Sequence, residues 1–98
     1  MATQWVISKG TGVQLESGAD FATFTPKAPW VILSICSTVA GRLSLMWGGV
    51  ACELNLGEDL NANVLHVFSF PVIEDRVYSL RFSANASVRW SMVQYGER

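Results

Sequence analysis

The stretch Arg42-Leu-Ser-Leu-Met-Trp-Gly-Gly-Val-Ala-Cys-Glu-Leu54 decides the fold. Gly48 and Gly49 lie between two apolar runs, and both central residues of a type I′ turn need the positive φ that glycine adopts easily. A two-residue turn fixes the register and places three pairs opposite one another: Trp47 with Val50, Leu45 with Cys52, and Leu43 with Leu54. Every pair is apolar, so the turn and the pattern of side chains predict the same antiparallel hairpin with one face in a core.

The rest of the chain repeats this pattern of short β-branched and aromatic runs between turn residues. No stretch has the i, i+3, i+4, i+7 apolar spacing of an amphipathic helix. The candidate strands are residues 4–8, 13–16, 20–25, 30–39, 42–47, 50–56, 64–70, 76–83 and 87–95. We therefore predict that residues 1–98 form a single all-β domain, an antiparallel β-sandwich of eight to nine short strands. Residues 57–63 and 71–75 are long enough for Greek-key connections, which favours a jelly roll.

A second hairpin is expected around residues 83–87. It would pair Phe82 with Val88, Leu80 with Trp90, and Tyr78 with Met92. Arg81 and Arg89 would then lie opposite each other on the outer face, where like charges repel. They could turn apart into water, hold an anion or a partner carboxylate, or be separated by a register two residues away. The two hairpins together predict twelve core residues: Leu43, Leu45, Trp47, Val50, Cys52, Leu54, Tyr78, Leu80, Phe82, Val88, Trp90 and Met92.

Composition indicates self-association. Of the 98 residues, 50% are apolar and 15% charged, against about 25% charged in ordinary soluble domains. The net charge of −1 comes without any Lys/Arg cluster, which argues against a nucleic-acid partner or a polybasic membrane anchor. The start of the chain has no signal-peptide pattern, and no apolar run is long enough to span a membrane.

Strand 30–39 is expected to be covered on both sides. Val31, Leu33, Ile35 and Val39 form one apolar face, and the opposite face is small and half apolar. We expect that opposite face to be the interface of a homo-oligomer, with a trimer favoured: Ile32, Ser34, Cys36 and Thr38. The arginines would then meet an acidic pair from another subunit or another protein, and Trp30 would lie at the rim. The predicted partner-binding residues are Arg81, Arg89, Glu58, Asp59, Glu74, Asp75 and Trp30.

No pattern of catalytic or metal-binding residues is present, so we expect no enzyme activity, no cofactor and no metal. The sequence has no GxSxG, HExxH, P-loop or GxGxxG motif. His66 is the one histidine, so a zinc site would need carboxylate ligands. The segment 59–63 begins like a calcium loop but lacks its glycine and glutamate, which favours a plain turn. Cys36 and Cys52 lie on different strands and are expected to stay unbridged.

Three segments have the character of strands in small viral jelly rolls: Trp30-Val-Ile-Leu-Ser-Ile-Cys-Ser-Thr, Arg76-Val-Tyr-Ser-Leu-Arg-Phe-Ser-Ala and Val88-Arg-Trp-Ser-Met-Val. In general character, over its whole length, the chain resembles the small jelly-roll decoration (cement) proteins of tailed bacteriophage heads. That resemblance implies a structural virion protein, made in the host cytoplasm, which binds the major capsid protein on the capsid surface and stabilises subunit joints. It carries over no functional residue, because no family motif is present.

Two other functions fit the same strand pattern. A carbohydrate- or receptor-binding jelly roll of a viral fibre or spike needs an exposed Trp or Tyr beside Asp, Asn or Arg in a groove. A small cupin-like enzyme normally needs two or more metal-ligand histidines, and this chain has one.

Overall fold

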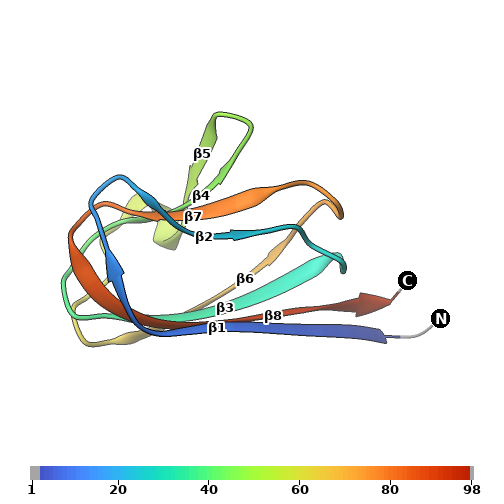
Figure 1. The fold of residues 1–98 in the computed structure, drawn as a ribbon, viewed down its shortest axis with the longest axis horizontal. Helices are drawn as coiled ribbons and strands as arrows, with labels where there is room; N and C mark the ends of the chain where they lie inside the picture. Colours follow the sequence, from blue (N-terminus) through green and yellow to red (C-terminus); the bar gives the residue numbers. More distant parts are fainter. Residues whose placement is uncertain (1–2, 98) are drawn as a thin grey trace.

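The computed structural model describes residues 3–97, with side chains at residues 10, 14 and 16–96. Two four-stranded antiparallel sheets pack face to face (Figure 1). The strands are β1 (Thr3–Leu15), β2 (Asp20–Phe24), β3 (Trp30–Ser37), β4 (Leu43–Trp47), β5 (Val50–Glu53), β6 (Leu65–Pro71), β7 (Tyr78–Phe82) and β8 (Ala86–Glu97). The one helical element in the described residues is a 3-10 turn, η1 (Asn55–Gly57), and no helix there could cross a bilayer. The predicted all-β sandwich is confirmed.

The strand order is that of a jelly roll. One sheet runs β1-β8-β3-β6 and the other β2-β7-β4-β5. Except for the β4–β5 hairpin, consecutive strands lie in different sheets, so the chain winds around the core as paired Greek keys do. Residues 4–8 and 13–16, predicted as separate strands, belong to one strand β1, whose register shifts between Gly10 and Val13. Residues 3–97 therefore contain eight strands.

The β4–β5 hairpin has the predicted register, with Leu45 opposite Cys52 and Trp47 opposite Val50. Gly48 and Gly49 have φ of 52° and 81°, as a type I′ turn requires. The predicted burial of β5 is wrong, however. Val50 is 48% exposed and Cys52 is exposed, while Leu54 is only partly buried against the core. Figure 1 shows the hairpin tip bending away from the opposite sheet, which agrees with the exposure of every residue of β5.

The predicted hairpin between β7 and β8 is also wrong. β7 lies between β2 and β4, and β8 lies between β1 and β3 in the other sheet. Arg81 is therefore not opposite Arg89, because its neighbours in register are Asp20 and Ser44. The error has a physical cause: alternating apolar residues are satisfied equally well by facing each other across a core as by pairing within one sheet.

The core lies between the two inner faces. β3 contributes alternate residues that are fully buried, Val31, Leu33 and Ile35. The buried cluster consists of Val31, Leu33, Ile35, Leu43, Leu45, Leu60, Tyr78, Leu80, Phe82, Ala86, Val88 and Met92. Trp47 and Trp90 are half-buried against it, so ten of the twelve predicted core residues pack in or against this cluster, Leu54 included.

We predict that Leu45→Ala and Leu80→Ala each lower the free energy of unfolding by about 2–5 kcal/mol, because each leaves a cavity in this core. Cys52→Ala on the exposed strand β5 is the control, with a loss below about 0.5 kcal/mol. Urea denaturation followed by tryptophan fluorescence measures all three. A loss below about 1 kcal/mol for either leucine variant would contradict its burial.

Candidate functional site

The outer face of sheet β1-β8-β3-β6 is largely apolar in the side chains that the structure describes. Among the side chains that the structure describes, Leu65 is 64%, Val67 58% and Trp30 43% exposed. We call the apolar face the following outward residues of β3, β6 and β8: Trp30, Ile32, Cys36, Leu65, Val67, Val93 and Tyr95. A sheet face in water normally alternates polar residues outward, so this surface is typical of one that contacts another molecule.

The apolar face has a hollow at one end. Cys36 lies between Arg89 on β8 and Leu65 on β6, and the next row toward the centre holds the small residues Ser91 and Ser34. A depression of about 440 Å³, the Cys36 depression, is lined by Gly10, Ser34, Cys36, Leu65, Arg89, Trp90 and Ser91. Small side chains therefore form its floor, while an apolar and a basic side chain flank it.

The predicted interface residues lie in this region with one exception. Ile32, Ser34 and Cys36 are half-buried on the outer face of β3. Thr38 follows the end of the strand, and its hydroxyl accepts a hydrogen bond from the Ser87 N–H at 3.1 Å. Val39, expected on the inner face, is 42% exposed, because β3 ends at Ser37 and the chain turns away. Whether these residues form an interface stays a prediction.

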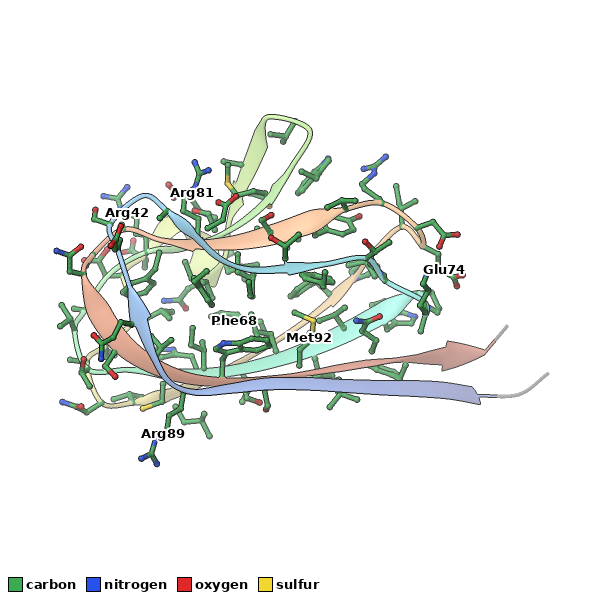
Figure 2. All side chains as sticks on the ribbon, in the orientation of Figure 1. Arg42, Phe68, Glu74, Arg81, Arg89 and Met92 are labelled. Atoms are coloured by element: carbon green, nitrogen blue, oxygen red, sulfur yellow. The ribbon has the colours of Figure 1, made fainter. Side chains whose placement is uncertain are left out.

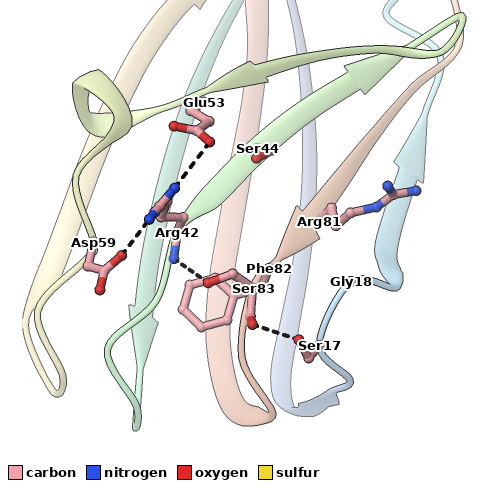
Figure 3. A pocket seen from close by; sticks show the side chains of 9 residues that line it. All are labelled: Ser17, Gly18, Arg42, Ser44, Glu53, Asp59, Arg81, Phe82 and Ser83. Atoms are coloured by element: carbon pink, nitrogen blue, oxygen red, sulfur yellow. Dashed lines mark hydrogen bonds and ion pairs between the residues drawn. The ribbon is translucent and has the colours of Figure 1, made fainter.

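The outer face of sheet β2-β7-β4-β5 is polar instead. Arg81 binds Asp20 at 2.9 Å, and Arg42 lies 3.4 Å from Asp59 and 3.7 Å from Glu53. A cleft of about 450 Å³, the arginine cleft, lies between the two arginines and is lined by Ser17, Gly18, Arg42, Ser44, Glu53, Asp59, Arg81, Phe82 and Ser83 (Figure 3). These pairs are exposed, and such pairs contribute about 0–1 kcal/mol each to stability.

The predicted partner-binding residues are therefore divided between the faces. Arg81 and Asp59 are already paired within the chain, and Asp75 binds Lys27 at 3.0 Å. Glu74 is half-buried. Glu58 is exposed. Figure 2 shows Arg89 pointing away from the apolar sheet, on the opposite side of the molecule from Arg42 and Arg81.

Of the two tryptophans Trp30 and Trp47, one is exposed on the apolar face and the other borders a further hollow. Trp30 is exposed at the start of β3. Trp47 packs edge-on against Tyr78, with ring centroids 5.7 Å apart. It also borders a hollow of about 290 Å³ together with Asp20 and Arg81. The sequence did not reveal this grouping, because Asp20 and Arg81 are far apart in the chain.

The imidazole of His66 contacts neighbouring residues of its own chain. Its Nε2 accepts a hydrogen bond from the Asn61 N–H at 3.1 Å, and its ring stacks on Phe68 with centroids 6.3 Å apart. No cluster of three or more His, Cys, Asp or Glu side chains suited to a metal exists in the part of the chain that the structure describes.

Comparison with known proteins adds no relative. No model of a protein family matches the sequence, and no curated protein is significantly similar to it in sequence.

The two thiols differ in environment. Cys36 is half-buried on the apolar face and Cys52 is exposed on β5 of the other sheet, and both are free. We predict two reactive thiols per denatured chain without reductant, and faster alkylation of Cys52 than of Cys36 in the native protein. Maleimide labelling with peptide mass spectrometry measures both rates. Finding no free thiol in the denatured chain, with no mass gain from other oxidation, would contradict this arrangement.

Proposed function

We propose that this chain is a structural virion protein that self-associates through its apolar face and binds the outside of a capsid, where it stabilises subunit joints. The observation that carries the proposal is the exposure of Leu65, Val67 and Trp30 on one outer face. A second copy is the occupant that composition favours, because only 15% of the residues are charged and obligate interfaces resemble a core cut in half. Small residues such as Ser34 permit close approach.

The polar face is then left for the shell. Self-association through one outer face keeps the outer face of sheet β2-β7-β4-β5 accessible, with the arginine cleft at one end of its strands. Charged groups at an interface give specificity and a faster association rate. We propose that this face contacts the major capsid protein and that a trimer does so at several points at once.

A second candidate function has one observation in its favour. Trp47, Asp20 and Arg81 border a common hollow, which is the combination that a carbohydrate- or receptor-binding jelly roll needs. Trp47 is half-buried and packs on Tyr78, so it offers a sugar less of its ring than an exposed tryptophan would. A glycan array with wild type and Trp47→Ala separates the two functions: glycan binding that Trp47→Ala abolishes would favour the second one.

We predict that Ser34→Lys dissociates the oligomer, because it places a charge between Ile32 and Cys36 of the apolar face without touching the core. Light scattering coupled to size exclusion measures the mass at micromolar concentration. Val77→Lys is the control, since Val77 is exposed but lies outside the apolar face. A Ser34→Lys variant that keeps the wild-type oligomer mass would show that β3 is not the interface.

We also predict that wild type co-sediments saturably with capsid shells assembled without it. Monomeric Ser34→Lys should bind those shells about 10²–10⁴-fold more weakly, because it loses multivalent attachment. The salt dependence of binding tests the charged face, since screening weakens such contacts. Absence of wild-type co-sedimentation at micromolar concentration would reject the decoration function.

A further inference from the structure

We infer that the loop of residues 54–59, the Leu56 loop, of one copy docks into the Cys36 depression of the next. Leu56 would be the buried apolar side chain of this contact, and Glu58 would pair with Arg89. This inference rests on the self-association in the proposed function and specifies how it occurs. It assigns the apolar face one occupant, a second copy of the chain.

Leu56 is presented to solvent in an unfavourable conformation. Its side chain is 98% exposed, and its backbone lies in the left-handed region with φ 57° and ψ 31°. Asn55 and Gly57 on either side also have positive φ. Left-handed backbone is disfavoured for a residue with a Cβ. Within the isolated chain neither the conformation nor the exposure stabilises anything, and such outliers gather at binding sites.

The Leu56 loop is held in place by its neighbours. The Gly57 N–H donates to the Leu54 carbonyl at 3.4 Å, and the Glu58 N–H to the Asn55 carbonyl at 3.0 Å. The Asn55 side-chain amide donates to the Glu58 and Asp59 carbonyls at 3.4 and 3.2 Å. A preformed loop loses little conformational freedom on docking, which favours binding.

Ion pairs fix the loop from both ends as well. Arg42 lies between Glu53, the last residue of β5, and Asp59, the last residue of the loop (Figure 3). The sandwich therefore holds the Leu56 side chain away from its own surface.

The Cys36 depression suits a leucine side chain. It is an open depression of about 440 Å³ on the surface, large enough to receive a side chain of that size. Leu65 and Cys36 provide apolar contact, and Ser34 and Ser91 leave the floor open. Docking would cover Leu65, which is 64% exposed.

The charges of the two surfaces are complementary. Glu58 and Arg89 are both exposed, and neither forms an ion pair with any residue that the structure describes. Two residues of chain span at most about 7 Å, and neighbouring strands lie about 5 Å apart. With Leu56 beside Cys36 and Leu65, Glu58 would therefore reach Arg89 on the adjacent strand.

The contact is head-to-tail, because the Leu56 loop and the Cys36 depression are different surfaces of the chain. Head-to-tail contacts close into rings when the rotation between copies allows it. A closed ring of three copies uses every Leu56 loop and every depression, which agrees with the trimer favoured above.

A charge exchange tests the ion pair. Glu58→Arg and Arg89→Glu should each raise the dissociation constant of the oligomer about tenfold or more, because each places like charges together. The double variant should return it to within about threefold of wild type, because the pair is restored with reversed signs. Sedimentation equilibrium measures the constants. Glu16→Arg, the same charge change at an exposed residue elsewhere, should have no effect. Single variants that match wild type, or a double variant no better than the singles, would overturn the pair.

Leu56→Gly tests the apolar contact separately from folding. Glycine accepts the left-handed φ, so at concentrations where both proteins are monomeric the melting temperature should be equal or higher. At higher concentrations, sedimentation equilibrium should show weaker self-association than in wild type. Unchanged self-association would overturn the role of Leu56.

Mixing two variants tests the head-to-tail geometry. Leu56→Asp lacks the docking side chain, and Ser34→Lys fills the depression, so each alone should be monomeric. Mixed equally, they retain one intact contact and should form a heterodimer but no trimer. If neither variant pairs with the other, the contact is not head-to-tail.

The variants also distinguish the docking contact from self-association in general. If Ser34→Lys dissociates and the Leu56 and Glu58 variants stay assembled, the docking contact is wrong while self-association through the apolar face stands. A wild-type protein that is monomeric would contradict both the docking of the Leu56 loop and self-association through the apolar face.

Discussion

The packing of two sheets around a single interior is the constraint on which everything else depends. A two-layer sandwich buries one face of each sheet, so a strand that is apolar on both faces must leave one of them outside. β3 is such a strand, with Val31, Leu33 and Ile35 in the core and Ile32 and Cys36 on the opposite side. Its neighbours extend the same character with Leu65 and Val67 on β6 and Val93 on β8. The apolar face is therefore built into the register of the sheet and is not a scatter of single exposed residues.

The two outer faces of the sandwich differ in polarity. Ion pairs gather on sheet β2-β7-β4-β5, where Arg81 and Arg42 bind Asp20, Glu53 and Asp59. Among the side chains that the structure describes, the outer face of the other sheet combines apolar residues with the small serines Ser34, Ser69 and Ser91, and its charged residue is Arg89 at the rim. A protein with this asymmetry can use one face to assemble with copies of itself and keep the other for a different surface. The proposed decoration function follows from that division, and the docking of the Leu56 loop adds a contact between the loop after β5 of one copy and the apolar face of the next.

The sequence predicts local pairing better than it predicts which sheet a strand joins. The Gly48-Gly49 turn fixes the β4–β5 register because both residues are in one hairpin. The inward-facing residues of β7 and β8 were predicted correctly, but the two strands lie in different sheets. The alternation of apolar residues shows which side chains face the core and does not show which sheet each strand joins. The outer face of β3 was predictable from Ile32 and Cys36. Leu65 and Val67 are exposed because they point outward from the edge strand β6, and Leu56 is exposed in a loop that no alternation pattern describes. Both exposures therefore needed the structure. The Arg81–Asp20 pair depends on β2 joining β7, which no local pattern indicates.

The central claim is that the apolar face is covered by further copies of the chain. The most direct measurement is the molar mass of the unmodified protein by sedimentation equilibrium, from low to high micromolar concentration. The account predicts three times the 10.8 kDa chain mass, in a single species that dissociates only on dilution. A mass of one chain across that whole concentration range would contradict it.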